Sequence, residues 1–167
     1  MTLATTLALK LTARQSKTFD LMTPAGYLEK IIEKTIADGT GAAQADLFFS
    51  DVRTIGATSN DDLDLAGSLT DIFGATITFA KVKAIYIENP STNNGDVVVG
   101  NEGTNPLVGW FGAGTHTIAI KPGGFLLIAS PTVAGYTVTA GTGDKLRVRN
   151  AGSASADIPV IIIGTSA

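Results

Sequence analysis

The chain has 167 residues, a net charge of −3 and no cysteine, a size that suits one domain or one domain with an arm. The lack of cysteine excludes disulfides, thiolate chemistry and cysteine-ligated zinc, and a pI near 5.0 gives no electrostatic case for nucleic-acid binding. Charged residues make up 16% of the chain, against about 25% in ordinary soluble domains. From Gly103 to Gly143 the one charged side chain is Lys121. We therefore expect a charged N-terminal part followed by a β region rich in Gly, Thr and Val.

Residues 1–20 are predicted to form an N-terminal arm or a first strand. Leu7, Leu9 and Leu11 occupy alternate positions there, as in an extended segment with one apolar side. Residues 21–167 are predicted to form a single β-sandwich domain.

One short helix is favoured near the start of that domain. Pro24 is typical of a helix start and Gly39 of a helix end. Between them, apolar side chains recur at helical spacing, at Leu28, Ile31, Ile32 and Ile36. The β character of the remaining chain leaves a strand open for residues 24–38.

The later part of the chain is predicted to consist of short strands and turns. We place strands at residues 47–49, 77–79, 81–87, 97–99, 117–120, 125–129, 136–139, 145–149 and 158–163. Asn94-Gly95 predicts a type I′ hairpin turn, and Pro122-Gly123 predicts a type II turn. The expected fold is all-β, a β-sandwich or jelly-roll-like domain with an extended N-terminal arm and at most one short helix.

The strands differ in how many of their faces are apolar. Residues 146–149 alternate Leu, Arg, Val, Arg, which is typical of a strand with one wet face, whereas 97–99, 125–129 and 160–163 are apolar throughout. With at most one helix to cover them, the outer faces are expected to pack on other copies in an obligate oligomer. The residues predicted at this interface are Leu7, Leu9, Leu11, Trp110, Phe111, Phe125, Leu127, Ile161 and Ile163.

No catalytic, cofactor-binding or metal site is predicted. His116 is the one histidine, and a general base needs partners that this sequence does not offer. It is better explained as a turn or strand-edge residue. Asp61, Asp62 and Asp64 form an acidic cluster without the spacing of a calcium loop. We interpret them as solvated loop carboxylates, with Asp64 able to cap the turn that follows.

Four stretches resemble a family of small virion proteins of tailed bacteriophages. They are residues 45–54, 62–89, 118–124 and 158–163. The resemblance implies a capsid decoration (cement) protein, a trimer seated on the head lattice, with the major capsid protein as partner. It also implies synthesis in the host cytoplasm and residence in the virion. It assigns no functional residue.

Two other functions remain open. A tail, neck or fibre-tip protein could contact the host surface, and a carbohydrate-binding module could stack sugars on Trp110, Phe111, Tyr86 and Tyr136. An interface role for the aromatic pair at 110 and 111 is favoured over a ligand site, because both lie in the charge-poor segment. Neither nucleic acid nor membrane is an expected partner.

Overall fold

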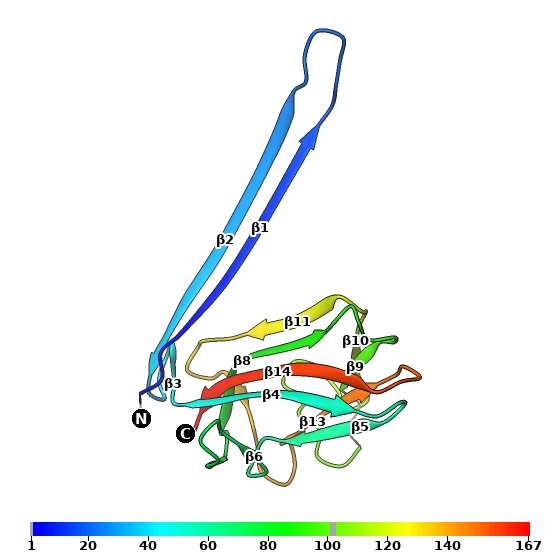
Figure 1. Ribbon diagram of the computed structural model, residues 1–167. Coiled ribbons are helices and arrows are strands. Elements are labelled where there is room, and N and C mark those ends of the chain that lie inside the picture. The colour runs from blue at the N-terminus through cyan, green and yellow to red at the C-terminus, as the bar shows by residue number, and fades with distance from the viewer. Residues whose placement is uncertain (1, 101–102) are drawn as a thin grey trace.

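The computed structural model describes residues 2–100 and 103–167. It shows a sandwich-like body of two antiparallel sheets, from which a long two-stranded arm projects (Figure 1). None of the described residues is helical, and within them no helix has the length and apolar character to cross a membrane. The all-β, sandwich-like prediction is confirmed. The strand order does not establish a jelly roll, so that narrower class stays a prediction.

The arm is a hairpin of β1 (Thr5–Ser16) and β2 (Ala25–Asp38), paired in unbroken antiparallel register from Thr5↔Ile36 to Ser16↔Ala25. At about 3.3 Å per residue, each strand is about 40 Å long or slightly more. The predicted arm boundary at residue 20 falls in the connecting tip, so the projecting element continues to Asp38. Near its base, β2 pairs with the short parallel strand β3 (Gln44–Ala45).

The favoured helix over residues 24–38 is wrong, because these residues form β2. The residues that suggested helical spacing are divided between the two faces of the strand. Leu28, Ile32 and Ile36 share one face, and Ile31 lies on the other. β1 supplies a partner along almost the whole length of β2, and this ladder outweighs the local helical spacing.

The body consists of two layers. The first sheet has the order β11-β8-β14-β4, with β12 added beside β8. Its strands are β4 (Leu47–Ile55), β8 (Lys81–Asn89), β11 (Gly124–Ala129), β12 (Tyr136–Thr137) and β14 (Ala156–Thr165). The second has the order β10-β9-β13-β5. Its strands are β5 (Asn60–Asp64), β9 (Val97–Gly100), β10 (Thr117–Ile120) and β13 (Lys145–Asn150), and β6 (Leu69–Thr70) pairs separately with β7 (Thr76–Ile77).

The core lies between these two sheets. Ile87 and Ile162 of the first sheet, and Val99 and Val148 of the second, are each at most 1% exposed and belong to one apolar cluster. Residues after Ala84 supply more of this cluster than residues before it. The outer faces of the two sheets lie outside this core.

The two predicted turns differ in outcome. The type II turn is confirmed, since Gly123 has a φ of 81° and the Gly124 amide donates to the Lys121 carbonyl over 2.8 Å. The hairpin turn at Asn94-Gly95 is wrong, because β8 and β9 belong to different sheets. Gly95 lies against the backbone of another loop, where an added Cβ would be 2.3 Å from the Gly152 Cα. Glycine is needed there for close approach.

Candidate interaction surface

The arm has one apolar and one charged face, because successive side chains of a strand point to opposite sides. The apolar arm face consists of Leu7, Leu9, Leu11, Ala13, Leu28, Ile32 and Ile36, with Lys30 and Lys34 among them. The charged arm face includes Lys10, Arg14, Tyr27, Glu29 and Glu33. On it the Lys10 ammonium pairs with Glu29 at 2.8 Å, and the Arg14 guanidinium lies 5.5 Å from the centre of the Tyr27 ring.

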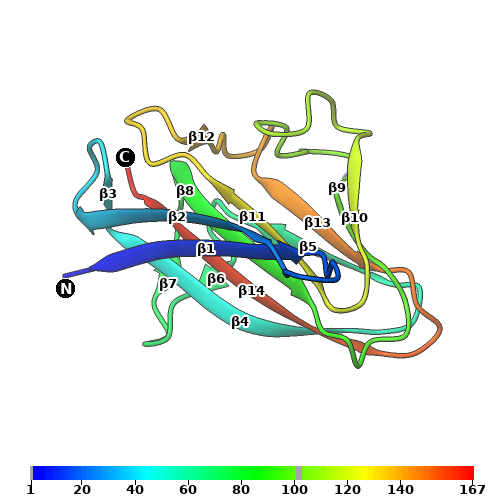
Figure 2. The same ribbon diagram turned by 90° about the horizontal axis from the view of Figure 1, so that it is seen from above.

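The apolar arm face is turned toward the first sheet of the body. At the base, Ile36 is 1% exposed and packs with Ala45, Ala84 and Ile163 in a small second cluster. Beyond the base the arm rises away from the sheet over which it passes (Figures 1 and 2). The two surfaces therefore enclose an open wedge with apolar walls.

Lys83 fixes the base of the arm to the body. Its side chain is fully buried, and its ammonium donates to the carbonyls of Gly41 (3.4 Å), Val133 (3.1 Å) and Thr132. Burial lowers the pKa of Lys83, and the charge of Lys81 adds to this effect. The three carbonyls come from the loop after β2 and the loop after β11, so one side chain ties both loops to β8.

The wedge contains a groove of about 430 Å³ between the arm and the sheet. Its walls are formed by Thr5, Thr6, Leu7, Ala8 and Leu9 from the arm and by Ala84, Ile85, Tyr86, Phe125, Leu127, Ile161 and Ile163 from the sheet. The outer sheet face, defined here as Val52, Tyr86, Phe125, Leu127 and Ile161, continues beyond it. Phe125 and Val52 are each 56% exposed, an unusual position for two large apolar side chains on one face.

The opposite side of the body is polar. On the outer side of the second sheet, Arg147 pairs across the strands with Asp62, and Arg149 is exposed beside Asn60. Arg147 donates to both carboxylate oxygens of Asp62, over 2.6 and 2.7 Å. This is the wet face that the alternation of 146–149 predicted, so the two sides of the sandwich differ strongly in character.

The tip of the arm, residues 17–24, carries three exposed apolar side chains. Leu21 is 97% exposed, Met22 66% and Phe19 51%. The Phe19 amide donates to the Met22 carbonyl over 2.8 Å, and the Lys17 ammonium lies 5.0 Å from the centre of the Phe19 ring. An apolar group at the far end of the arm has no folding role in one copy, which suggests contact with another molecule.

The structure brings most of the predicted interface residues together. Those that line the groove are Leu7, Leu9, Phe125, Leu127, Ile161 and Ile163. Leu11 lies farther along the same arm face. The tip residues and Val52 were not predicted. The adjacent Leu21 and Met22, flanked by the turn-forming Asp20 and Pro24, were the available signal.

Trp110 and Phe111 lie elsewhere, partly buried against the main core. The Trp110 ring stands edge-on to Tyr136, with centroids 5.1 Å apart and planes at 86°, and its centroid is 5.8 Å from that of Phe111. The Trp110 side chain therefore serves packing within one copy. His116 is exposed just before β10, where its Nδ1 contacts the Phe111 carbonyl.

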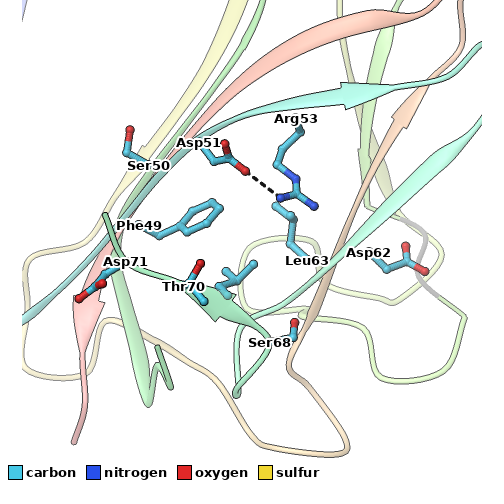
Figure 3. Close-up of a pocket in the computed structure, with 10 residues that line it drawn as sticks. Phe49, Ser50, Asp51, Arg53, Asp62, Leu63, Ser68, Thr70 and Asp71 are labelled. Carbon is cyan, nitrogen blue, oxygen red and sulfur yellow. Dashed lines mark hydrogen bonds and ion pairs between the residues drawn. The ribbon is translucent and has the colours of Figure 1, made fainter. Parts of the chain in front are cut away.

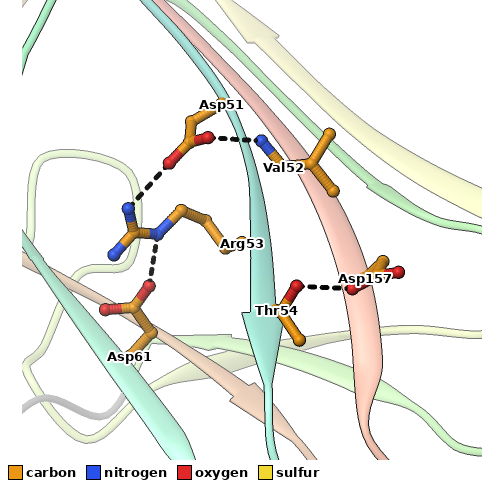
Figure 4. A network of polar contacts seen from close by, with 6 residues as sticks. All are labelled: Asp51, Val52, Arg53, Thr54, Asp61 and Asp157. Atoms are coloured by element: carbon orange, nitrogen blue, oxygen red, sulfur yellow. Dashed lines mark hydrogen bonds and ion pairs between the residues drawn. The ribbon is translucent and has the colours of Figure 1, made fainter.

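A polar pocket of about 270 Å³ lies between β4, β5 and β6 (Figure 3). Arg53 crosses it, donating from Nε to Asp61 over 2.6 Å and from a terminal nitrogen to Asp51 over 2.8 Å (Figure 4). These two hydrogen bonds raise the pKa of Arg53, and the bond with Asp61 has the larger effect. Asp51 and Asp62 are paired with arginines and Asp71 accepts from the amides of Phe73 and Ala75, so we interpret the pocket as structural. In the described ranges no group of three acidic or histidine side chains is placed to hold a metal.

The loop interpretation of the acidic cluster is wrong, because Asp61, Asp62 and Asp64 lie on β5. Asp61 and Asp62 face arginines of neighbouring strands. Asp64 does cap the next turn, accepting from the Ala66 amide over 2.9 Å. Pairing of β5 with β13 brings Arg147 to Asp62 from a distant part of the chain, which local spacing could not reveal.

We expect Asp62→Asn to cost less than about 1 kcal/mol at neutral pH, since the ion pair is partly exposed. The hydrogen bonds from Arg147 lower the pKa of Asp62 below its ordinary 3.8. A carboxyl group whose pKa is lower in the folded than in the unfolded chain stabilises the fold at pH values above its unfolded pKa. This stabilisation is lost as the pH falls through the pKa of the folded state. Thermal unfolding should therefore show the variant and the parent converging as the pH drops below 3.8. A difference that persists or grows in acid would contradict this assignment.

Comparisons of the chain with protein-family models, with curated proteins and with solved structures give no match. The arguments for a function therefore rest on the geometry of the arm, the wedge and the tip. That geometry offers apolar surface for protein contact on one side of the molecule.

Proposed function

We propose that this chain is a non-enzymatic structural protein of a bacteriophage virion, a trimeric decoration protein that stabilises the head lattice. One observation carries the proposal: the arm, its tip and the outer sheet face hold most of the large apolar side chains that are exposed in a single copy, with Ile72, Phe73, Val108 and Val133 exposed elsewhere. Such a distribution suits a subunit that works by packing against neighbours. The resemblance of residues 45–54 and 62–89 to phage virion proteins supports the same reading.

In this proposal the body and the arm have different tasks. Copies associate with one another through the arm and the sheet beneath it, and the tip contacts the major capsid protein. Burial of apolar surface contributes about 25 cal/mol per Å², offset by the cost of association. Selective binding to the expanded shell would then raise the stability of that shell by mass action.

The proposal is tested by counting copies of the chain in purified particles with quantitative mass spectrometry. Hundreds of copies per particle are expected of a decoration protein. On the order of six copies or fewer, the numbers of ring symmetries at a neck or tail, would instead support the tail alternative. Absence from the particle would overturn both.

A further inference from the structure

We propose that the apolar arm faces of three copies pack together around a common axis, and that the outer sheet faces close the base of this bundle. This inference rests on the trimer of the proposed function and identifies the surface that forms it. The occupant of the wedge is thus a second copy of this chain.

The first argument is that the arm needs cover before it meets any foreign partner. An isolated two-stranded hairpin is at best marginally stable in water. Past the base, Leu9 is 40% exposed, Leu11 57%, Leu28 55% and Ile32 41%. A newly made copy meets other copies first, so an identical face is the cover that is always present. Packing it against itself removes all four side chains from water at once.

The second argument is charge. Residues 5–38 carry five basic and four acidic side chains, so neighbouring arms carry a net charge of only +1 and repel little. Lys30, Lys34 and Glu33 make no ion pair with any residue in ranges 2–100 and 103–167. Lysine stems can lie along the apolar seam while the ammonium groups reach its edge. On the apolar arm face both charges are positive, so the ammonium groups must reach past its edge toward Glu33 on the charged arm face of a neighbouring copy.

The third argument is area. An arm face about 40 Å long and about 10 Å wide presents about 400 Å². Three such faces remove about 1,200 Å² from water in the whole trimer, or about 400 Å² per pairwise contact, so the outer sheet faces must supply the larger share of a specific interface. The charged arm face, with its Lys10–Glu29 pair, remains toward solvent. A cyclic arrangement also uses the same patch on every copy, and the assembly is closed.

The test is the oligomeric state of two matched variants of the full chain. Leu11→Glu places a charge on the apolar arm face opposite Lys30, and Thr12→Lys places one on the charged arm face opposite Glu29. Each new side chain gains an oppositely charged cross-strand neighbour, so both hairpins are equally supported. In light scattering at micromolar concentration, we expect trimers of the parent and of Thr12→Lys, and monomers of Leu11→Glu.

Because the chain has no cysteine, single cysteines report proximity directly. Leu11→Cys should form disulfide-linked dimers on oxidation, since equivalent residues approach one another around the axis, and Thr12→Cys should not. If Leu11→Glu loses its circular dichroism signal, Phe125→Lys, opposite Glu88 on the outer sheet face, replaces it. Ala119→Lys, exposed on the polar side, is its control.

A monomeric parent, or equal behaviour of the Leu11 and Thr12 variants, would overturn the inference. A monomeric parent that binds lipid vesicles or the capsid protein through Leu11 would show that this other molecule, and not a second copy, covers the apolar arm face. The proposed function fails separately. A parent that forms trimers through the arm but is absent from particles refutes the virion role and leaves the bundle intact.

Discussion

If the chain is the proposed decoration protein, shortening the arm should abolish its binding to the phage shell and leave the body folded. The change replaces residues 11–30 by Asn-Gly, joining Lys10 to Ile31, which already face one another across the strands. The variant keeps Ile36, which seals the base, and loses the tip together with the outer part of the apolar arm face, Leu11, Ala13 and Leu28. Burial of the three apolar tip side chains, Phe19, Leu21 and Met22, against the shell would contribute about 1.5–3 kcal/mol each. Even after ordering costs, binding should weaken at least about 100-fold.

Binding to purified expanded shells, measured by co-sedimentation, tests this prediction. A tip-only variant, Leu21→Ser with Met22→Ser, is the matched comparison, because it keeps the whole apolar arm face. It should remain trimeric and bind weakly, which would separate the two tasks of the arm. A shortened arm that sediments with shells as the parent does would show that the arm is not the contact.

Asn150→Leu should lower the free energy of unfolding by about 3–4 kcal/mol. Asn150 is 1% exposed at the end of β13. Its amide nitrogen donates to the carbonyls of Ile55 (3.0 Å), Gly56 (3.1 Å) and Ala154 (2.7 Å), and its oxygen accepts from the Gly152 amide over 2.8 Å. Leucine leaves these backbone groups buried without partners, at about 1–3 kcal/mol for each group that water cannot reach.

Thermal unfolding should show a fall of about 10 °C for Asn150→Leu, at about 2–4 °C per kcal/mol for a chain of this size. Ser153→Ala serves as the control. Ser153 is exposed in the same loop, accepting one bond from Asn94, so its loss should cost less than about 0.5 kcal/mol. Equal melting temperatures for the two variants would show that Asn150 does not hold the loops together.

The sequence predicted most strands of the body, because their apolar runs are short and turn residues separate them, but it missed the acidic strand β5. It could not predict which sheet each strand joins. Asn94-Gly95 looks like a hairpin turn, yet the chain crosses there from one layer to the other. At this crossing Gly95 lies in close contact with Gly152. That contact joins residues far apart in sequence and leaves no local pattern.

The arm was half predicted for a similar reason. Alternation at Leu7, Leu9 and Leu11 indicates an extended segment, whereas the spacing in residues 24–38 favours a helix and leaves a strand open. Considered alone, the isoleucines at 31 and 32 are compatible with a helix or with a strand. Only pairing with β1 separates them onto opposite faces. The apolar excess on 125–129 and 160–163, by contrast, identified the outer sheet face because no internal element was available to cover both sides.

The position of β14 has a consequence for biosynthesis. This last strand lies between β8 and β4 and is hydrogen-bonded to both, so the first sheet cannot close until residues 156–165 have left the ribosome. The arm pairs residues that are neighbours along the chain and can zip up while translation continues. Because such a hairpin is marginal by itself, arms of nascent chains on one polysome would become stable only where they meet one another. Subunits could find one another through their arms before either body has folded.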